Sequence, residues 1–234
     1  MSALNENQQK SVPGQDTSTL QKVLNVGTSA LQSYKPVKQI CQHVCAFHFY
    51  AQDMSRQVEA HHYCSCTNDE VRQCVIYDSA DSNARLIGIE YIISRRLFES
   101  LPEEEKKLWH SHTYEVMSGM LYAPGVPNAA EAAEMAKLVD TYGKTWHTWQ
   151  VDRGDTLPLG PPQLMMAFTK DGQLKEGLVA DRDSRCGKST AELKEYRDGK
   201  LTPPKTIATG ANHWETSGGK AVQLELKEVP FKGA

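Results

Sequence analysis

The segment QCVIYDSADSNARLIGIEYIIS, residues 73–94, decides the fold class. Two runs rich in β-branched and aromatic residues, Cys74 to Tyr77 and Leu86 to Ile93, flank a loop of Asp, Ser and Asn. Two such runs around a polar loop predict antiparallel strands joined as a hairpin. Strand-like and helix-like segments follow each other irregularly along the rest of the chain, unlike the regular alternation of a parallel sheet. The sequence therefore predicts an α+β fold: a single domain with a mainly antiparallel sheet and a few short helices.

Periodicity and capping residues predict the remaining elements. Strands are expected at KTWHTWQV (144–151), LMMAF (164–168) and AVQLELKEV (221–229), and HTYEVMSGMLYAPG (112–125) is expected to be extended. Helices are expected at residues 19–34, 102–109, 129–142 and from the capping box at Ser189 to Gly199. Gly143 is expected to end the third of these helices as its C′ residue.

The domain organisation follows from length and local composition. Residues 1–18 are polar and aperiodic, so they are predicted to be a disordered lead. The chain has 234 residues, of which 39% are hydrophobic, and it contains no internal repeat. Residues 19–234 are therefore expected to form one α+β domain.

Composition excludes several classes of partner. The net charge is -3 and no block of Lys or Arg stands out, so no nucleic-acid partner is expected. No segment approaches the roughly 20 apolar residues of a transmembrane helix. The N-terminus lacks the apolar region of a secretory signal, which predicts a cytoplasmic protein. In that compartment the six cysteines are expected to be reduced thiols, with one disulfide left open.

Histidines cluster in a way that predicts a metal site. Five of the eight histidines fall in three short segments, HHYCSC (61–66), WHSH (109–112) and KTWHTW (144–149). Imidazole nitrogen and thiolate sulfur are common ligands of zinc, and imidazole also suits iron. His110 and His112, at i and i+2 on a strand, would project to one face. The expected ligands of a divalent ion, zinc or iron, are His62, Cys64, His110, His112 and His147.

Two carboxylates and two tryptophans complete the predicted site. Glu90 interrupts an apolar strand; if it faces inward, burial would raise its pKa and suit it to act as a general base, whereas the alternative places it on the solvent face. Glu115, three residues after His112, is the second candidate catalytic residue. Trp146 and Trp149 flank His147 and are candidate walls of an apolar substrate pocket, with core packing as the alternative.

A series of motifs carries a resemblance to a known family. The motifs, in chain order, are CAFHFY (45–50), HHYC (61–64), QCVIYDS (73–79), RLIGIEYIIS (85–94), WHSHTYEV (109–116), YGKTWHTWQ (142–150) and LPLGPPQLMMA (157–167). Over roughly residues 40–185 the chain resembles the oil-body-associated protein family. The resemblance implies association with lipid droplets in the plant members, and it brings no established reaction with it.

Two functional hypotheses result. The first is a metal-dependent enzyme, either a zinc hydrolase or a mononuclear-iron oxygenase, that acts on a small apolar ligand. The alternative is a non-catalytic protein that docks on the lipid-droplet surface or on partners, for which residues 19–34 offer the only amphipathic helix. A homodimer is left open by both hypotheses.

Overall fold

A computed structural model describes residues 12–233 of the chain. The strands are Gln42–Tyr50 (β1), Asp53–Asn68 (β2), Val71–Tyr77 (β3), Leu86–Ser94 (β4), His110–Ser111 (β5), Thr141–His147 (β6) and Gln163–Met166 (β7). The helices are Thr19–Leu31 (α1), Arg95–Glu99 (α2), Glu103–Lys106 (α3), Thr113–Met117 (α4), Asn128–Leu138 (α5), Glu176–Cys186 (α6), Thr190–Arg197 (α7) and His213–Thr216 (α8). Two 3-10 helices, Val37–Gln39 (η1) and Val151–Arg153 (η2), complete the elements.

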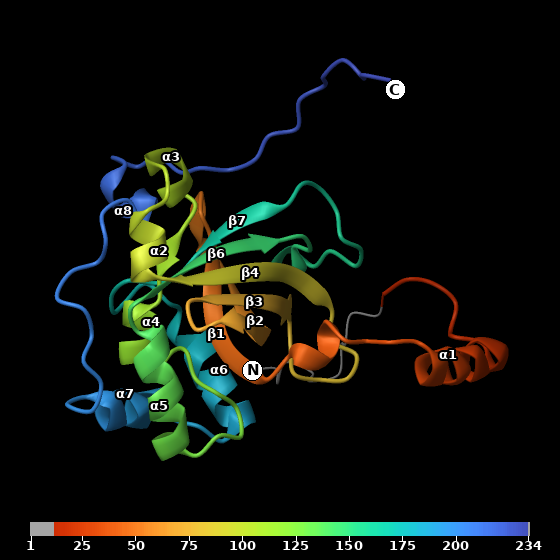
Figure 1. Ribbon diagram of the computed structural model, residues 1–234, viewed down its shortest axis with the longest axis horizontal. Helices are drawn as coiled ribbons and strands as arrows, with labels where there is room; N and C mark the ends of the chain where they lie inside the picture. The colour runs from red at the N-terminus through yellow and green to blue at the C-terminus, as the bar shows by residue number, and fades with distance from the viewer. Residues whose placement is uncertain (1–11, 234) are drawn as a thin grey trace, which may run out of the picture.

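Six strands form a closed antiparallel barrel in the order β4-β3-β2-β1-β7-β6 (Figure 1). The barrel closes because β4 also pairs with β6, from Gly88 opposite His147 to Ser94 opposite Thr141. The short strand β5 extends the sheet on the other edge of β6. The α+β class with an antiparallel sheet is thus confirmed, and the closure of the sheet is a feature that the strand patterns did not predict.

Alternation along the strands divides side chains between the barrel interior and the outer face. Interior side chains form two apolar clusters. One contains Val44, Ala46, Cys64, Cys74 and Ile92, and the other contains Tyr50, Val58, Ala60, Ile76 and Met165. Along β1, His48 lies between Ala46 of the first cluster and Tyr50 of the second. Along β2, His62 lies in the same way between Cys64 and Ala60. The barrel therefore encloses a polar layer between two apolar ones.

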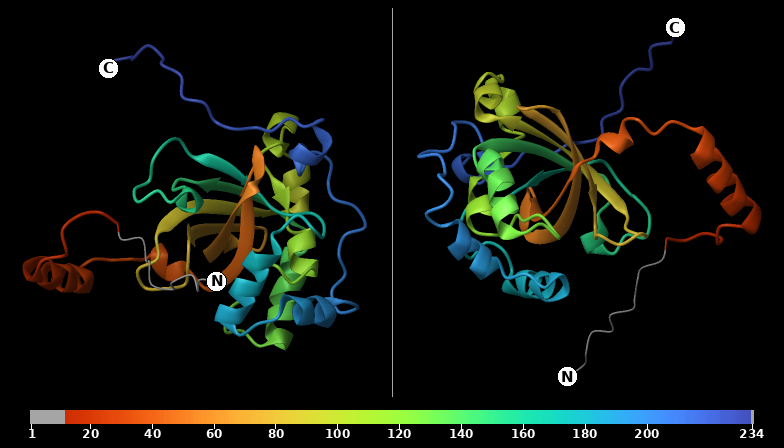
Figure 2. Two further views of the ribbon diagram at one scale, coloured as in Figure 1. Left: turned by 180° about the vertical axis from the view of Figure 1, so that it is seen from behind. Right: turned by 60° about the horizontal axis from the view of Figure 1, so that its bottom comes forward.

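Helices cover one side of the barrel, whereas α1 stands apart from it (Figures 1 and 2). Arg197 on α7 is fully buried and contacts Glu131 on α5 at 3.1 Å. Its guanidinium also donates hydrogen bonds to the carbonyls of Val116 and Leu121. This buried pair fixes the segment that follows α4 against α5 and α7.

Several sequence predictions are confirmed. The hairpin is formed by β3 and β4, which pair from Val71 opposite Ile93 to Tyr77 opposite Leu86. The hydroxyl of Ser189 accepts a hydrogen bond from the backbone amide of Glu192 and caps α7 as expected. The disordered lead stays a prediction: residues 12–18 are exposed, and residues 1–11 lie outside the described residues. No helix within residues 12–233 has both the length and the apolar character that a bilayer crossing would need.

Other predictions are wrong. The segment 112–125 contains the helix α4 instead of being extended throughout. The helix expected at 129–142 ends at Leu138, and Gly143 lies in β6 opposite Ile92, because barrel closure recruits residues 141–147 as a strand. Residues 221–229 form no strand. Instead, the side chain of Gln223 bonds to both the amide and the carbonyl of Leu164 on β7.

Cys64 and Cys74 form a disulfide across β2 and β3. The two residues are direct partners in the strand register, so their sulfur atoms meet inside the barrel. The expectation of reduced thiols is therefore wrong for this pair. The other four cysteines, Cys41, Cys45, Cys66 and Cys186, are free.

Candidate metal centre

The polar layer inside the barrel consists of five histidines and one glutamate. Each of four barrel strands contributes one of them: His48 from β1, His62 from β2, Glu90 from β4 and His147 from β6. His110 lies on β5, and His112 is the residue immediately before α4. All six side chains are at most 2% exposed. His110 and His112 were expected on one strand, but His112 adopts a helical backbone conformation and immediately precedes α4. The bend between them still leaves their ring centroids 5.2 Å apart.

Glu90 lies at the centre of this layer. Its Oε2 is 2.9 Å from Nε2 of His62. Its Oε1 is 3.1 Å from Nε2 of His112 and 3.3 Å from Nε2 of His110. Glu90 therefore faces inward, which decides between the two alternatives that its sequence context left open.

His48 and His147 form a second part of the layer. Nδ1 of His48 lies 3.2 Å from Nε2 of His147. His48, His62 and Glu90 each offer one ligand atom within 4.8 Å of the other two, as do Glu90, His110 and His112. The structure thus brings His62, His110 and His112 to one carboxylate, whereas His147 contacts His48 and belongs to neither of the two groups.

Several buried polar atoms in this layer have no hydrogen-bond partner. Both ring nitrogens of His62 and both of His110 lack one among the described residues. The contacts of these two rings with Glu90 are close but do not have hydrogen-bond geometry. Buried polar atoms are rarely left unsatisfied in proteins, and a site that binds an ion is one standard reason. The donor set of imidazole nitrogens and one carboxylate fits zinc and iron.

The charges in the layer also fit a cation. Burial raises the pKa of Glu90, but its contacts with His110, His112 and His62 outweigh burial and leave the pKa well below the usual range. Burial lowers the pKa of His48, of His112 and of His147, the last to about 3. The carboxylate is therefore charged and these three imidazoles are neutral, so none of the three supplies a positive charge to balance Glu90.

Glu115 is the second buried carboxyl group of this region. It lies on α4 and is 1% exposed, and its Oε1 has no hydrogen-bond partner among the described residues. Burial, with a smaller contribution from the charge of Glu90, raises the pKa of Glu115 well above its usual value. The raised pKa that was expected for Glu90 is thus found at Glu115 instead.

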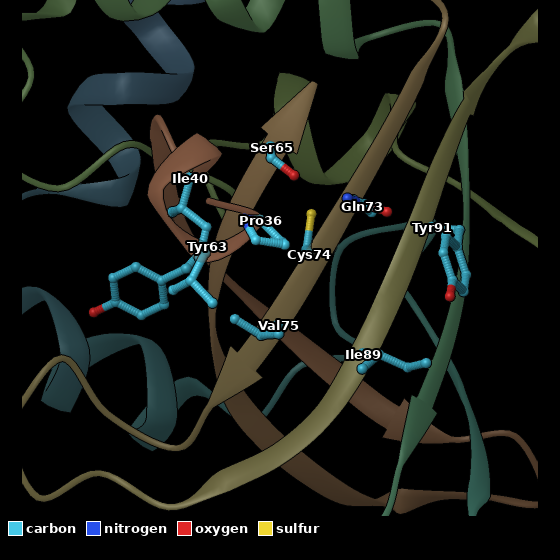
Figure 3. Close-up of a pocket in the computed structure, with 10 residues that line it drawn as sticks. Pro36, Ile40, Tyr63, Ser65, Gln73, Cys74, Val75, Ile89 and Tyr91 are labelled. Atoms are coloured by element: carbon cyan, nitrogen blue, oxygen red, sulfur yellow. The ribbon is translucent and has the colours of Figure 1, made fainter. Parts of the chain in front are cut away.

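Three other predicted site residues belong to neither of the two groups of potential ligands around Glu90. The sulfur of Cys64 is bonded to Cys74 and is not a free ligand. Trp146 packs in the cluster of Phe47 and Leu164 outside the barrel, and Trp149 packs in a different cluster. The groove in Figure 3 lies on the outer face of β2, β3 and β4 and is lined by other residues, among them Tyr63, Val75, Ile89 and Tyr91.

Sequence reasoning missed His48 and the role of Gly143. The alternating pattern of CAFHFY (45–50) contains a signal for His48, because a strand there places one histidine among apolar inward-facing residues. Gly143 lies directly behind the ligand atoms: a Cβ at this position would be 2.8 Å from Nε2 of both His110 and His112. No local sequence pattern predicts that a glycine will lie this close to side chains from other strands.

Comparisons with known proteins give consistent matches. Residues 34–200 match the model of a family described as a protein of unknown function, DUF1264. The chain is 52% identical to oil body-associated protein 1B of Arabidopsis thaliana, covering 94% of this chain and 90% of that protein. It is 47% identical to oil body-associated protein 1A of Zea mays, covering 93% and 90%, and 48% identical to protein 2A of the same species, covering 86% and 81%. No solved structure matches the chain.

Proposed function

Since this chain belongs to the DUF1264 family, whose relatives are named oil body-associated proteins, we propose that it is a metalloprotein with one divalent ion inside its barrel. The ligands are His62, Glu90, His110 and His112. His48 either joins them or orients His62, and His147 positions His48 through its ring nitrogen. A ligating histidine whose other nitrogen is held in this way is a common feature of metal sites.

One observation carries the proposal: His62 and His110 turn unsatisfied nitrogens toward the same carboxylate in a fully buried layer. A network of hydrogen bonds alone would leave these nitrogens unpaired, at about 1–3 kcal/mol for each. It would also leave the charge of Glu90 in a fully buried site with no metal cation beside it. A bound divalent ion removes both costs.

The enzymatic part of the proposal assigns a role to Glu115. A bound ion supplies Lewis acidity or, if it is iron, redox chemistry. The two histidines and one carboxylate at residues 90, 110 and 112 are a donor set that suits mononuclear iron as well as zinc. Glu115 is buried and holds its proton, so it is the group that would deliver a proton beside the centre. A small apolar substrate could reach the centre only if the surrounding segments move, because His110 and His147 are fully buried.

Metal analysis tests the site. The chain is purified without a polyhistidine tag, and its metal content is measured by mass spectrometry after dialysis against a weak chelator. The double variant His110→Ala/His112→Ala should lose about one equivalent per chain relative to the wild type, because two of the four ligands are removed. The control is His213→Ala, which removes a partly exposed histidine on α8 that belongs to neither part of the polar layer. Equal metal content in all three proteins would reject the site.

A second candidate function is association with an oil-body surface, and α1 favours it. None of its residues is buried, and its apolar side chains are exposed, from 49% at Leu24 to 89% at Leu31. Leu20, Leu24 and Leu31 recur at intervals of four and seven residues and therefore share one face. The segment 36–40, which joins α1 to the barrel, lines the apolar groove of Figure 3. An amphipathic helix of this kind can lie in the plane of a lipid surface.

Flotation with emulsified triacylglycerol coated with phosphatidylcholine tests this function. The variant Leu20→Asp/Leu24→Asp places two charges on the apolar face of α1 and should lose most of its flotation. The matched control Gln21→Asp/Asn25→Asp adds the same charge to the polar face and should float like the wild type. Equal flotation of the two variants would exclude α1 as the anchor. A cytoplasmic location stays a prediction, which cell fractionation can test.

A further inference from the structure

A second group of metal-binding side chains lies on the outer face of the barrel wall. Cys45 on β1 and His61 on β2 are direct partners in the strand register, and Glu59 lies two residues before His61 on the same face. Because His62 faces the barrel interior, its neighbour His61 must face outward. Cys45 is fully buried and His61 is 2% exposed, whereas Glu59 is half-buried.

The three donor atoms face one another. Sγ of Cys45 is 3.9 Å from Nε2 of His61 and 3.8 Å from Oε1 of Glu59. Nε2 of His61 is 2.9 Å from that same Oε1. In a tetrahedral zinc site with usual bond lengths, ligand atoms of these types lie roughly 3.3–3.6 Å apart. The observed separations bracket that range, so an ion would require only small movements of the side chains.

The arrangement does not suit activation of the thiol as a nucleophile. In a catalytic triad, the carboxylate holds the ring nitrogen opposite to the one that faces the nucleophile. Here the thiol and the carboxylate both approach Nε2 of His61, and Nδ1 of that ring lies 3.0 Å from Nε2 of His43. Convergence of a thiol, a carboxylate and an imidazole on one point is the pattern of metal ligands, with His43 orienting the ring.

The surrounding charges leave Oε1 of Glu59 available as a ligand atom. Arg185 on α6 binds Oε2 of Glu59 at 2.5 Å, so Oε1 remains directed at the other two donors. Arg182 is the other cation near Cys45; its side chain approaches the thiol and is also paired with Asp183 at 3.1 Å. The helix α6 thus orients Glu59 through Arg185.

We propose that Cys45, Glu59 and His61 form a second metal site, which takes a zinc ion and leaves its fourth position to water. The site shares no ligand with the centre inside the barrel, and it does not rest on the proposed function of that centre. It differs from the interior centre in one chemical respect, because a cysteine sulfur is among its ligands.

Cobalt substitution tests this proposal selectively. The full-length chain, purified without a tag, is stripped of metal and loaded with Co²⁺. A thiolate bound to Co²⁺ gives a charge-transfer band in the near ultraviolet, and the interior centre has no cysteine ligand that could produce one. The wild type should show this band, and Cys45→Ser should abolish it. Cys41→Ser, which removes an exposed free cysteine, should leave it unchanged.

Further variants separate the two sites and guard against misfolding. His110→Ala/His112→Ala should keep the charge-transfer band even if it loses the interior ion. His43→Ala should weaken zinc affinity about tenfold, because a supporting partner of His61 is removed. If Cys45→Ser does not fold by circular dichroism, Glu59→Gln replaces it and should weaken zinc binding at least as much as His43→Ala. A folded wild type without the band, or a band that survives in Cys45→Ser, would overturn the proposal.

Discussion

Gly143 lies so close to Glu90 that a Cβ on Gly143 would be 2.0 Å from Oε1 of that carboxylate. The strand β6 therefore brings its backbone against the centre of the polar layer, and the side chains of that layer occupy the space that a side chain at residue 143 would need. The proposed interior centre thus depends on a residue that offers no ligand atom.

Gly143→Ala should consequently disturb both metal binding and stability. The added methyl group must displace Glu90 or the strand, which we expect to cost about 1–3 kcal/mol of unfolding free energy and to reduce bound metal. Urea unfolding and metal analysis measure the two effects. The control is Gly177→Ala on α6, where a Cβ would meet nothing within 4 Å. A Gly143→Ala protein with wild-type stability and metal content would show that the layer is loosely packed and holds no ion.

Glu115 should make the stability of the metal-free protein depend on pH. Its pKa is raised in the folded state above the usual 4.5, so the folded protein retains a proton that the unfolded chain loses. The resulting stability is fully present below pH 4.5 and is lost as pH rises toward the folded pKa, by up to about 1.4 kcal/mol for each pH unit.

Glu115→Gln removes this effect because the amide is neutral at every pH. The variant should be more stable than the wild type at pH 8, and the difference should shrink at pH 5. Guanidinium unfolding of chelator-treated protein measures both values. Glu195→Gln, on the exposed side of α7, serves as a control and should show no such trend. If the advantage of Glu115→Gln is the same at both pH values, the carboxyl group is ionised in the fold.

The parts of the fold that sequence could predict are those with local signals. The hairpin of β3 and β4 has β-branched residues on both sides of a polar loop, and the start of α7 has a capping serine. Barrel closure has no such signal, because it depends on pairing between β4 and β6, which are some 50 residues apart in sequence. For the same reason the helix expected to run to Tyr142 stops early, since pairing on both edges of β6 outweighs local helix preference.

The sequence predicted the types of residue at the candidate site better than it predicted their positions in space. His62, His110 and His112 meet at Glu90, and the inward position of Glu90 follows from its register opposite Cys74 and Thr145. No local pattern separates Cys64 from these residues, because only the strand register shows that it faces Cys74. The segment HHYCSC contains His61 beside the predicted ligand His62, and a strand sends these two neighbours to opposite sides of the wall.

The disulfide between Cys64 and Cys74 should be detectable and stabilising. After denaturation without reductant, four of the six cysteines should react with a thiol reagent, as the four free cysteines imply. Cys64→Ala/Cys74→Ala should lose roughly 2–3 kcal/mol of unfolding free energy, because the bond closes a short loop. The control Cys41→Ser/Cys66→Ser changes two exposed thiols and should cost far less. Six reactive thiols in the native sequence would show that the bond does not form.

Deletion of residues 1–33 should leave the barrel intact. The helix α1 has no buried residue, so its removal takes no side chain out of the core. We therefore propose that the folded unit begins near residue 34, later than the boundary at residue 19 that the sequence predicted. The melting temperature of the shortened chain should lie within about 3 °C of the wild type, because far less than 1 kcal/mol is lost. Bound metal should be unchanged, whereas flotation with triacylglycerol particles should fall. A large drop in melting temperature would mean that residues preceding the barrel pack against it, and unchanged flotation would place the lipid contact elsewhere on the chain.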